Sequence, residues 1–126
     1  MTPLLFALTI LAGGLGAGLR FVVDSLVRTR TGTAFPWGTM VVNVSGSLVL
    51  GLLTGLASSV APDAPWLTVL GVGLMGGYTT FSTATVESVR LLLARRPAAS
   101  ALNGVGMLLL CTAAAYLGLI VGAAIG

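Results

Sequence analysis

The chain has 126 residues, of which 56% are hydrophobic and 7% are charged, with six arginines, three acidic side chains, no lysine and no histidine. A soluble domain carries charge on about a quarter of its residues, so this composition predicts an integral membrane protein. The net charge of +3 comes from arginines that form no basic face, which excludes a nucleic-acid partner. An enzyme is not expected, because the sequence has no histidine, no carboxylate pair and no metal-ligand cluster.

Four apolar segments are long enough to cross a bilayer as helices, which requires about 20 residues each. Polar or proline-containing segments separate them, at residues 28–33, 61–65 and 95–97. The predicted transmembrane helices are residues 3–27, 37–60, 66–93 and 98–125. The sequence therefore predicts one all-α membrane domain over residues 1–126.

Arginines lie at only one end of these spans. With four crossings, both termini and the loop around Asp63 share one side of the membrane, and that side carries no arginine. The other side receives Arg20, Arg28, Arg30, Arg90, Arg95 and Arg96. Because cytoplasmic ends of spans are enriched in arginine and lysine, we expect a cell-membrane protein with both termini outside and one fixed orientation.

The third predicted span contains the run Gly76-Gly77-Tyr78-Thr79-Thr80-Phe81-Ser82-Thr83. Glycine carries an entropy cost in a helix, and serine and threonine compete for the backbone hydrogen bonds. In a membrane, an interrupted helix persists only where its freed backbone groups face protein, an ion or water. The sequence therefore predicts an interrupted third helix, with the functional centre at the interruption.

The second span carries polar side chains within a band about 100° wide on one helix face. They are Thr39, Asn43, Ser47, Thr54 and Ser58. The serines and threonines are explained equally well by hydrogen bonds between helices or by a water-filled path. The amide of Asn43 is more costly in lipid, which favours a functional role or a specific role in a dimer.

Small residues recur at four-residue spacing on the second and fourth spans. They are Ser47, Gly51 and Gly55, and then Ala114, Gly118, Gly122 and Gly126. Such residues let helix backbones approach closely in lipid, so the pattern predicts helix packing. Towards the arginine-bearing end, Asp24 and Glu87 are expected to pair with arginines.

Three motifs in this order resemble those of a known family. They are Gly13-Gly14-x-Gly16-Ala17-x-x-Arg20-Phe21, Gly38-Thr39-x-x-Val42-Asn43-x-x-Gly46-Ser47, and the run from Gly76 to Thr83 with Glu87. Together they resemble the Fluc (CrcB) fluoride channels over nearly the whole chain. The resemblance implies a four-helix subunit that pairs antiparallel with a second subunit. Two pores along the interface would let cytoplasmic fluoride leave the cell passively, which lowers its toxicity.

The resemblance also implies roles for individual residues. The residues assigned to the fluoride pore are Asn43, Ser47, Thr80, Phe81, Ser82 and Thr83. Asn43 would donate its amide N–H to fluoride, and Phe81 would present its ring edge; such donors suit a small, strongly hydrated anion. A structural sodium ion, not transported, would bind the backbone carbonyls of Gly76 and Thr79. Arg20 and Glu87 would support the vestibule.

The sequence departs from the family pattern at three positions. A second phenylalanine is expected where Ala84 stands, and a tyrosine and a serine are expected at Asn103 and Met107. These departures leave open a non-conducting or half-pore subunit that needs a different partner chain rather than a second copy of itself. A small multidrug-type exporter is another alternative, but it needs a carboxylate deep in the first span, and none precedes Asp24. A non-transporting scaffold subunit is the remaining alternative function.

Overall fold

The computed structural model describes residues 1–126 and contains helices and no strands, which confirms the all-α class. In chain order the elements are α1 (Pro3–Thr31), α2 (Trp37–Val60), α3 (Pro65–Leu67), η1 (Thr68–Met75), α4 (Gly76–Tyr78), α5 (Ser82–Leu93), α6 (Pro97–Ala101), η2 (Leu102–Gly106) and α7 (Met107–Ile125). The two η elements are π-helical, with wider turns than an α-helix, and each continues directly into the α-helical turns beside it.

Capping residues and prolines determine where several helices begin and end. At the start of α1, the Thr2 hydroxyl accepts the N–H of Leu5 at 3.1 Å. Pro65 and Pro97 stand in the first turns of α3 and α6, where a missing N–H costs no helical hydrogen bond. Gly32 follows α1 with φ 77°, a conformation that favours glycine.

Three helices are long and apolar enough to cross a membrane: Pro3–Thr31, Trp37–Val60 and Pro97–Ile125. The helix Trp37–Val60 has the bounds predicted for the second span. The helix Pro97–Ile125 starts one position before the predicted fourth span, 98–125. The first continues to Thr31 instead of ending at residue 27. Arginines in its last turn interact favourably with the negative end of the helix dipole, which explains the extension.

The residues of the predicted third span are divided between two helical stretches. The first consists of α3, η1 and α4 and runs from Pro65 to Tyr78, and the second is α5, which begins at Ser82. Thr79 between them is extended, with φ −78° and ψ 160°. The glycines and hydroxyl side chains of the run 76–83 lie on both sides of this point.

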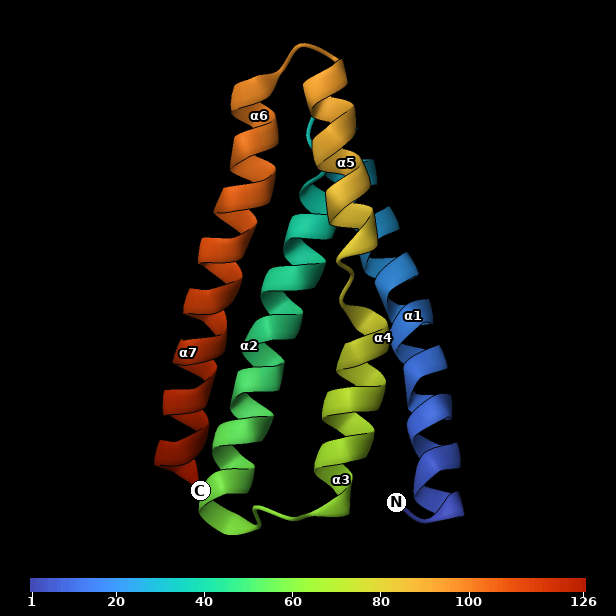
Figure 1. The fold of residues 1–126 in the computed structure, drawn as a ribbon, viewed down its shortest axis with the longest axis vertical. Helices are drawn as coiled ribbons and strands as arrows, with labels where there is room; N and C mark the ends of the chain where they lie inside the picture. Colours follow the sequence, from blue (N-terminus) through green and yellow to red (C-terminus); the bar gives the residue numbers. More distant parts are fainter.

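The helices α2 and α7 run side by side along much of their length (Figure 1). Glycines make this close approach possible. A Cβ added at Gly51 would collide with the carbonyl of Ala115, and one added at Gly118 would collide with the carbonyl of Leu48. The predicted close packing of small residues on these two helices is therefore confirmed.

Glycines also join α1 to η1 and α4. A Cβ at Gly16 would collide with the carbonyl of Leu74, and one at Gly77 would collide with the carbonyl of Gly13. The first glycine motif of the chain thus serves helix packing.

Both termini lie at one end of the molecule, together with the connection at residues 61–64 (Figure 1). The turn between α5 and α6 lies at the other end, where the Arg96 guanidinium donates to the Ala34 carbonyl. A small apolar cluster lies towards this end and consists of Phe35, Met40, Leu91 and Met107. Most other large apolar side chains are exposed, as suits helices surrounded by lipid.

Candidate functional site

The point between α4 and α5 is held by one side chain of α2. Asn43 Oδ1 accepts the N–H of Thr80 at 2.8 Å, and Asn43 Nδ2 donates to the Thr80 carbonyl at 2.7 Å. These two bonds replace the helical hydrogen bonds that Thr80 does not make. Asn43 is buried, so it satisfies backbone groups that would be costly to leave unpaired in an apolar environment.

The amide of Asn43 makes a third contact inside the chain. Its Nδ2 also donates to the sulfur of Met107 on α7, at 3.1 Å. The one side chain therefore joins α2, α7 and the segment between α4 and α5.

Hydroxyl groups cap the start of α5. The Thr80 hydroxyl accepts the N–H of Thr83 at 3.2 Å and donates to the Thr83 hydroxyl at 3.1 Å. The Thr79 hydroxyl donates to the Met75 carbonyl at 2.9 Å and so closes the end of α4. Local backbone interactions therefore use the hydroxyls of Thr79 and Thr80.

The backbone carbonyls of Gly76 and Thr79 are among those at this point that accept no hydrogen bond within the chain, because the backbone and side-chain donors nearby bond to other acceptors. Gly76 is exposed, and a Cβ added to it would meet no atom within 4 Å. Free carbonyls at the end of a helical segment suit a sodium ion, so these residues fit the predicted ligand pair.

A cavity of about 350 Å³, here named the asparagine cavity, lies between α2, α5 and the start of the last helical stretch. Four predicted pore residues border it: Asn43, Ser47, Thr80 and Phe81. The three positions that depart from the family pattern, Ala84, Asn103 and Met107, border it as well. The structure thus brings the three departures and four of the six expected lining residues to one place.

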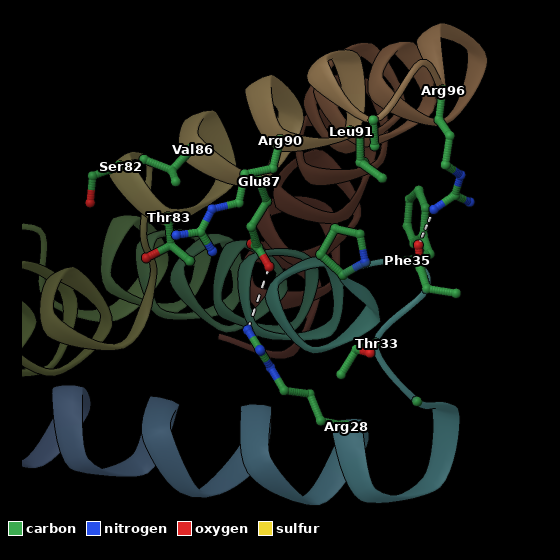
Figure 2. A pocket seen from close by; sticks show the side chains of 14 residues that line it. Arg28, Thr33, Phe35, Ser82, Thr83, Val86, Glu87, Arg90, Leu91 and Arg96 are labelled. Carbon is green, nitrogen blue, oxygen red and sulfur yellow. Dashed lines mark hydrogen bonds and ion pairs between the residues drawn. The ribbon is translucent and has the colours of Figure 1, made fainter.

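A larger cavity of about 630 Å³, the arginine cavity, lies at the end of the molecule that carries the arginines. It is bordered by the predicted site residues Ser82, Thr83 and Glu87, and by Arg28, Arg90 and Arg96. Figure 2 shows Arg28 reaching from α1 towards Glu87 on α5, at 3.5 Å.

Arg28 also pairs with Asp24 at 3.0 Å, one turn earlier on α1. The prediction that both Asp24 and Glu87 pair with arginines is confirmed, and a single arginine serves both. Arg28 is about half exposed, so these pairs contribute little to stability.

A third cavity of about 300 Å³, the threonine cavity, lies between α1, α2 and the start of α5. It is bordered by Arg20, Thr39, Thr80 and Thr83. The predicted site residues are therefore distributed over three cavities around the start of α5. Thr80 borders the asparagine and threonine cavities, and Thr83 borders the threonine and arginine cavities.

Phe81 and Gly76 face outward from the chain. Phe81 is 87% exposed, which is unusual for an aromatic ring unless lipid or another protein chain covers it. Gly76 has open space above its Cα. The chain alone does not enclose either residue.

Two further contacts in this region could not be predicted from the sequence. Asn103 is fully buried and donates to Ser88 Oγ at 2.9 Å and to the Ala84 carbonyl at 3.3 Å. The hydroxyls of Ser45 and Tyr78 lie 2.9 Å apart and join α2 to α4. Helical periodicity assigns residues to faces but does not say which distant residue stands opposite.

The polar stripe predicted on α2 is only partly turned inward. Thr39 and Asn43 are buried, and Ser47 is half-buried. Thr54 and Ser58 are exposed, and their hydroxyls donate to carbonyls of their own helix, those of Leu50 and Gly55. Within one chain, the stripe forms a cavity wall only in its first half.

Comparisons with known proteins show the family to which this chain belongs. Residues 7–119 match the family described as CrcB-like protein, Camphor Resistance (CrcB). The "Fluoride-specific ion channel FluC 1" of Leifsonia xyli subsp. xyli is 50% identical over 97% of this chain and 89% of that protein. The "Fluoride-specific ion channel FluC" of Magnetococcus marinus is 43% identical over 89% of this chain and 92% of that protein. "Fluoride-specific ion channel FluC 2" of Cutibacterium acnes is 45% identical with the same coverage. This chain is therefore a multi-pass membrane protein that belongs to the CrcB-like family.

Proposed function

We propose that the chain is a subunit of a fluoride-specific ion channel, through which cytoplasmic fluoride leaves the cell passively. The observation that carries the proposal is the group of hydrogen-bonding residues gathered where α4 ends and α5 begins, in a chain whose relatives are named fluoride channels. A family of ion channels also agrees with the expectation that the chain is not an enzyme, and it argues against the multidrug-type exporter.

The proposed pore lining consists of Asn43, Ser47, Thr80, Phe81, Ser82 and Thr83. Fluoride holds its hydration water tightly, so a pore must offer hydrogen-bond donors in place of water. Amide and hydroxyl groups serve this purpose, and the positive edge of the Phe81 ring adds a weaker attraction. Arg20 and Glu87, which border the threonine and arginine cavities, are proposed to support the vestibule.

A second subunit, antiparallel to the first, is proposed to complete each pore. The exposure of Phe81 supports this, because another chain would cover the ring and enclose the space beside it. In this arrangement α3 to α4 and α5 together make the third, interrupted crossing. The arginine-bearing end would lie in the cytoplasm, with both termini outside.

A structural sodium ion is proposed at the carbonyls of Gly76 and Thr79. Both carbonyls lack a hydrogen bond within the chain, and both lie where the helical stretch ends. A bound cation would offset the cost of leaving them unpaired in an apolar interface. Because Gly76 faces outward, the same ion could contact the partner subunit.

Reconstitution of the purified chain into liposomes tests the function. With fluoride inside and none outside, we expect fluoride efflux well above that of protein-free liposomes, and no comparable efflux of chloride. Equal efflux of the two halides would contradict a fluoride-specific channel. Absence of any efflux, also after co-expression with related chains, would contradict a channel altogether.

The second candidate is a subunit that conducts only with a different partner chain. It is favoured by the arginines gathered at one end, which give one orientation, and by Ala84, Asn103 and Met107 in the asparagine cavity. An antiparallel pair would then need a second chain with its arginines at the opposite end. Efflux by the chain alone would reject this candidate, and efflux only after co-expression would support it.

A further inference from the structure

The asparagine cavity contains few free hydrogen-bond donors, although it is bordered by many polar side chains. The hydroxyls of Thr79, Thr80, Thr85 and Ser88 each donate to another group within the chain. Among the hydroxyls that border the cavity, only that of Ser47 donates to no group in the chain. Besides this hydroxyl, the amide of Asn43 is the main hydrogen-bond donor that the cavity could offer to an anion.

Both N–H groups of Asn43 are already used. One donates to the Thr80 carbonyl at 2.7 Å and the other to Met107 Sδ at 3.1 Å. The bond to Thr80 is part of the reciprocal pair that holds the start of α5, so it cannot be given up without freeing backbone groups. The bond to the thioether is the replaceable one, because sulfur is a weak acceptor.

Met107 is not free to move aside. Its side chain is 6% exposed and packs in the apolar cluster with Phe35, Met40 and Leu91. The sulfur is therefore held beside Asn43 by the same packing that joins the ends of α2, α5 and α7. Moving the sulfur away would disturb this cluster.

Asn103, one turn before Met107, also provides no free hydrogen-bond donor. Its Nδ2 group faces α5 and donates to Ser88 Oγ and the Ala84 carbonyl, whereas its buried Oδ1 has no hydrogen-bond partner. Because the Ala84 carbonyl can only accept, the amide cannot be reversed. Asn103 thus offers no free N–H group to an anion in the cavity.

From these contacts we infer that Met107 is a specificity-determining residue of this chain that withholds the Asn43 donor from fluoride. The inference rests on the proposed function. The side of the asparagine cavity formed by η2 and α7 therefore offers no free N–H group, because Asn103 donates to α5 and the Met107 sulfur only accepts. Fluoride can bind along this face only when it displaces the sulfur of Met107 from Asn43. Fluoride conduction past Asn43 is therefore low, and Met107 determines the rate.

Side-chain amide NMR offers a direct test. The chain contains two asparagines and no glutamine, so [¹⁵N]asparagine labelling gives side-chain signals from Asn43 and Asn103 alone. Replacement of Met107 by Ser removes the sulfur and adds a donor, and Met107→Leu removes the acceptor at similar volume. Met40→Ser is the matched control, because Met40 lies in the same cluster at 5% exposure and makes no hydrogen bond to Asn43.

Without fluoride, we expect the Asn43 signals to move in both Met107 variants and to stay in place in Met40→Ser. On titration with sodium fluoride, the Asn43 signals of Met107→Ser should shift at a fluoride concentration at least tenfold lower than that needed for the unchanged chain. In liposomes, fluoride efflux should rise at least tenfold in Met107→Ser and less in Met107→Leu.

The outcomes separate the inference from the function. Fluoride titrations and efflux that are equal in the unchanged chain and Met107→Ser would overturn the inference and leave the channel intact. Asn43 signals that do not move in either Met107 variant would overturn it too. If no variant responded to fluoride or conducted it, alone or with related chains, the proposed function would fail and the inference with it.

Discussion

Asn43 and Thr80 exchange two hydrogen bonds, so a single side chain of α2 satisfies both backbone groups of the residue between α4 and α5. A side chain that mimics a peptide group in this way allows a helical stretch to end inside an apolar region. The second N–H of the same amide donates to the sulfur of Met107, so the surroundings of Asn43 determine whether this N–H can bind another acceptor.

Replacement of Asn43 by Asp should impair both the fold of this region and transport. The carboxylate cannot donate to the Thr80 carbonyl, and it places negative charge beside the asparagine cavity. We expect a loss of about 1–3 kcal/mol in stability from the unpaired carbonyl, and a drop in fluoride efflux of at least tenfold. Thermal unfolding in detergent and liposome efflux measure the two effects. Unchanged efflux would remove Asn43 from the anion path.

Replacement of Phe81 by Ile should lower fluoride efflux and leave the subunit folded, because the ring is 87% exposed and supports no packing within the chain. Phe35→Ala is the contrasting variant. Phe35 is buried in the apolar cluster, so its truncation should cost about 3–5 kcal/mol in stability. If Phe81→Ile unfolded the subunit or abolished its association, Phe81 would be a packing residue and not a pore residue.

The adjacent glycines Gly76 and Gly77 provide a matched pair of variants. A side chain at Gly76 meets no atom of the same chain, so Gly76→Val should leave the subunit folded but weaken its association with the partner. A methyl group at Gly77 collides with the Gly13 carbonyl, so Gly77→Ala should destabilise the subunit itself. Cross-linking and thermal unfolding distinguish the two. Normal association of Gly76→Val would argue against an interface at this residue.

Exchange of sodium for a large organic cation should weaken the dimer. The Gly76 and Thr79 carbonyls would then lose their proposed ligand and face each other across an apolar interface. We expect a larger fraction of monomers by cross-linking in N-methylglucamine than in sodium at equal ionic strength. A monomer fraction that does not depend on the cation would remove the sodium site.

Local properties of the sequence were sufficient to predict the helical architecture and to single out Asn43 as an unusual side chain, whereas its role in a pore stays a prediction. Helix bounds follow from apolar length and from the breaking residues, and an amide is costly in lipid wherever it stands. The partners of Asn43 could not be predicted, because Thr80 lies 37 residues away and Met107 lies 64 residues away. The packing of α2 against α7 brings Met107 to Asn43, and the contacts of α2 with α4 and α5 bring Thr80 to it.

The distribution of the predicted pore residues over three cavities has a simple geometric origin. Successive residues at the start of a helix point about 100° apart, so Phe81 borders the asparagine cavity, Ser82 the arginine cavity, and Thr83 the arginine and threonine cavities. A motif that is continuous in sequence is therefore divided in space.

The position of the two chain ends has a consequence for engineering tandem proteins. Because the N- and C-termini lie at the same end of the molecule (Figure 1), a short linker between two copies would force both into the same orientation. A head-to-tail gene fusion could yield opposed copies only if the linker itself traversed the bilayer. Tandem fusions with and without such an extra crossing would thus impose one relative orientation or the other from a single reading frame.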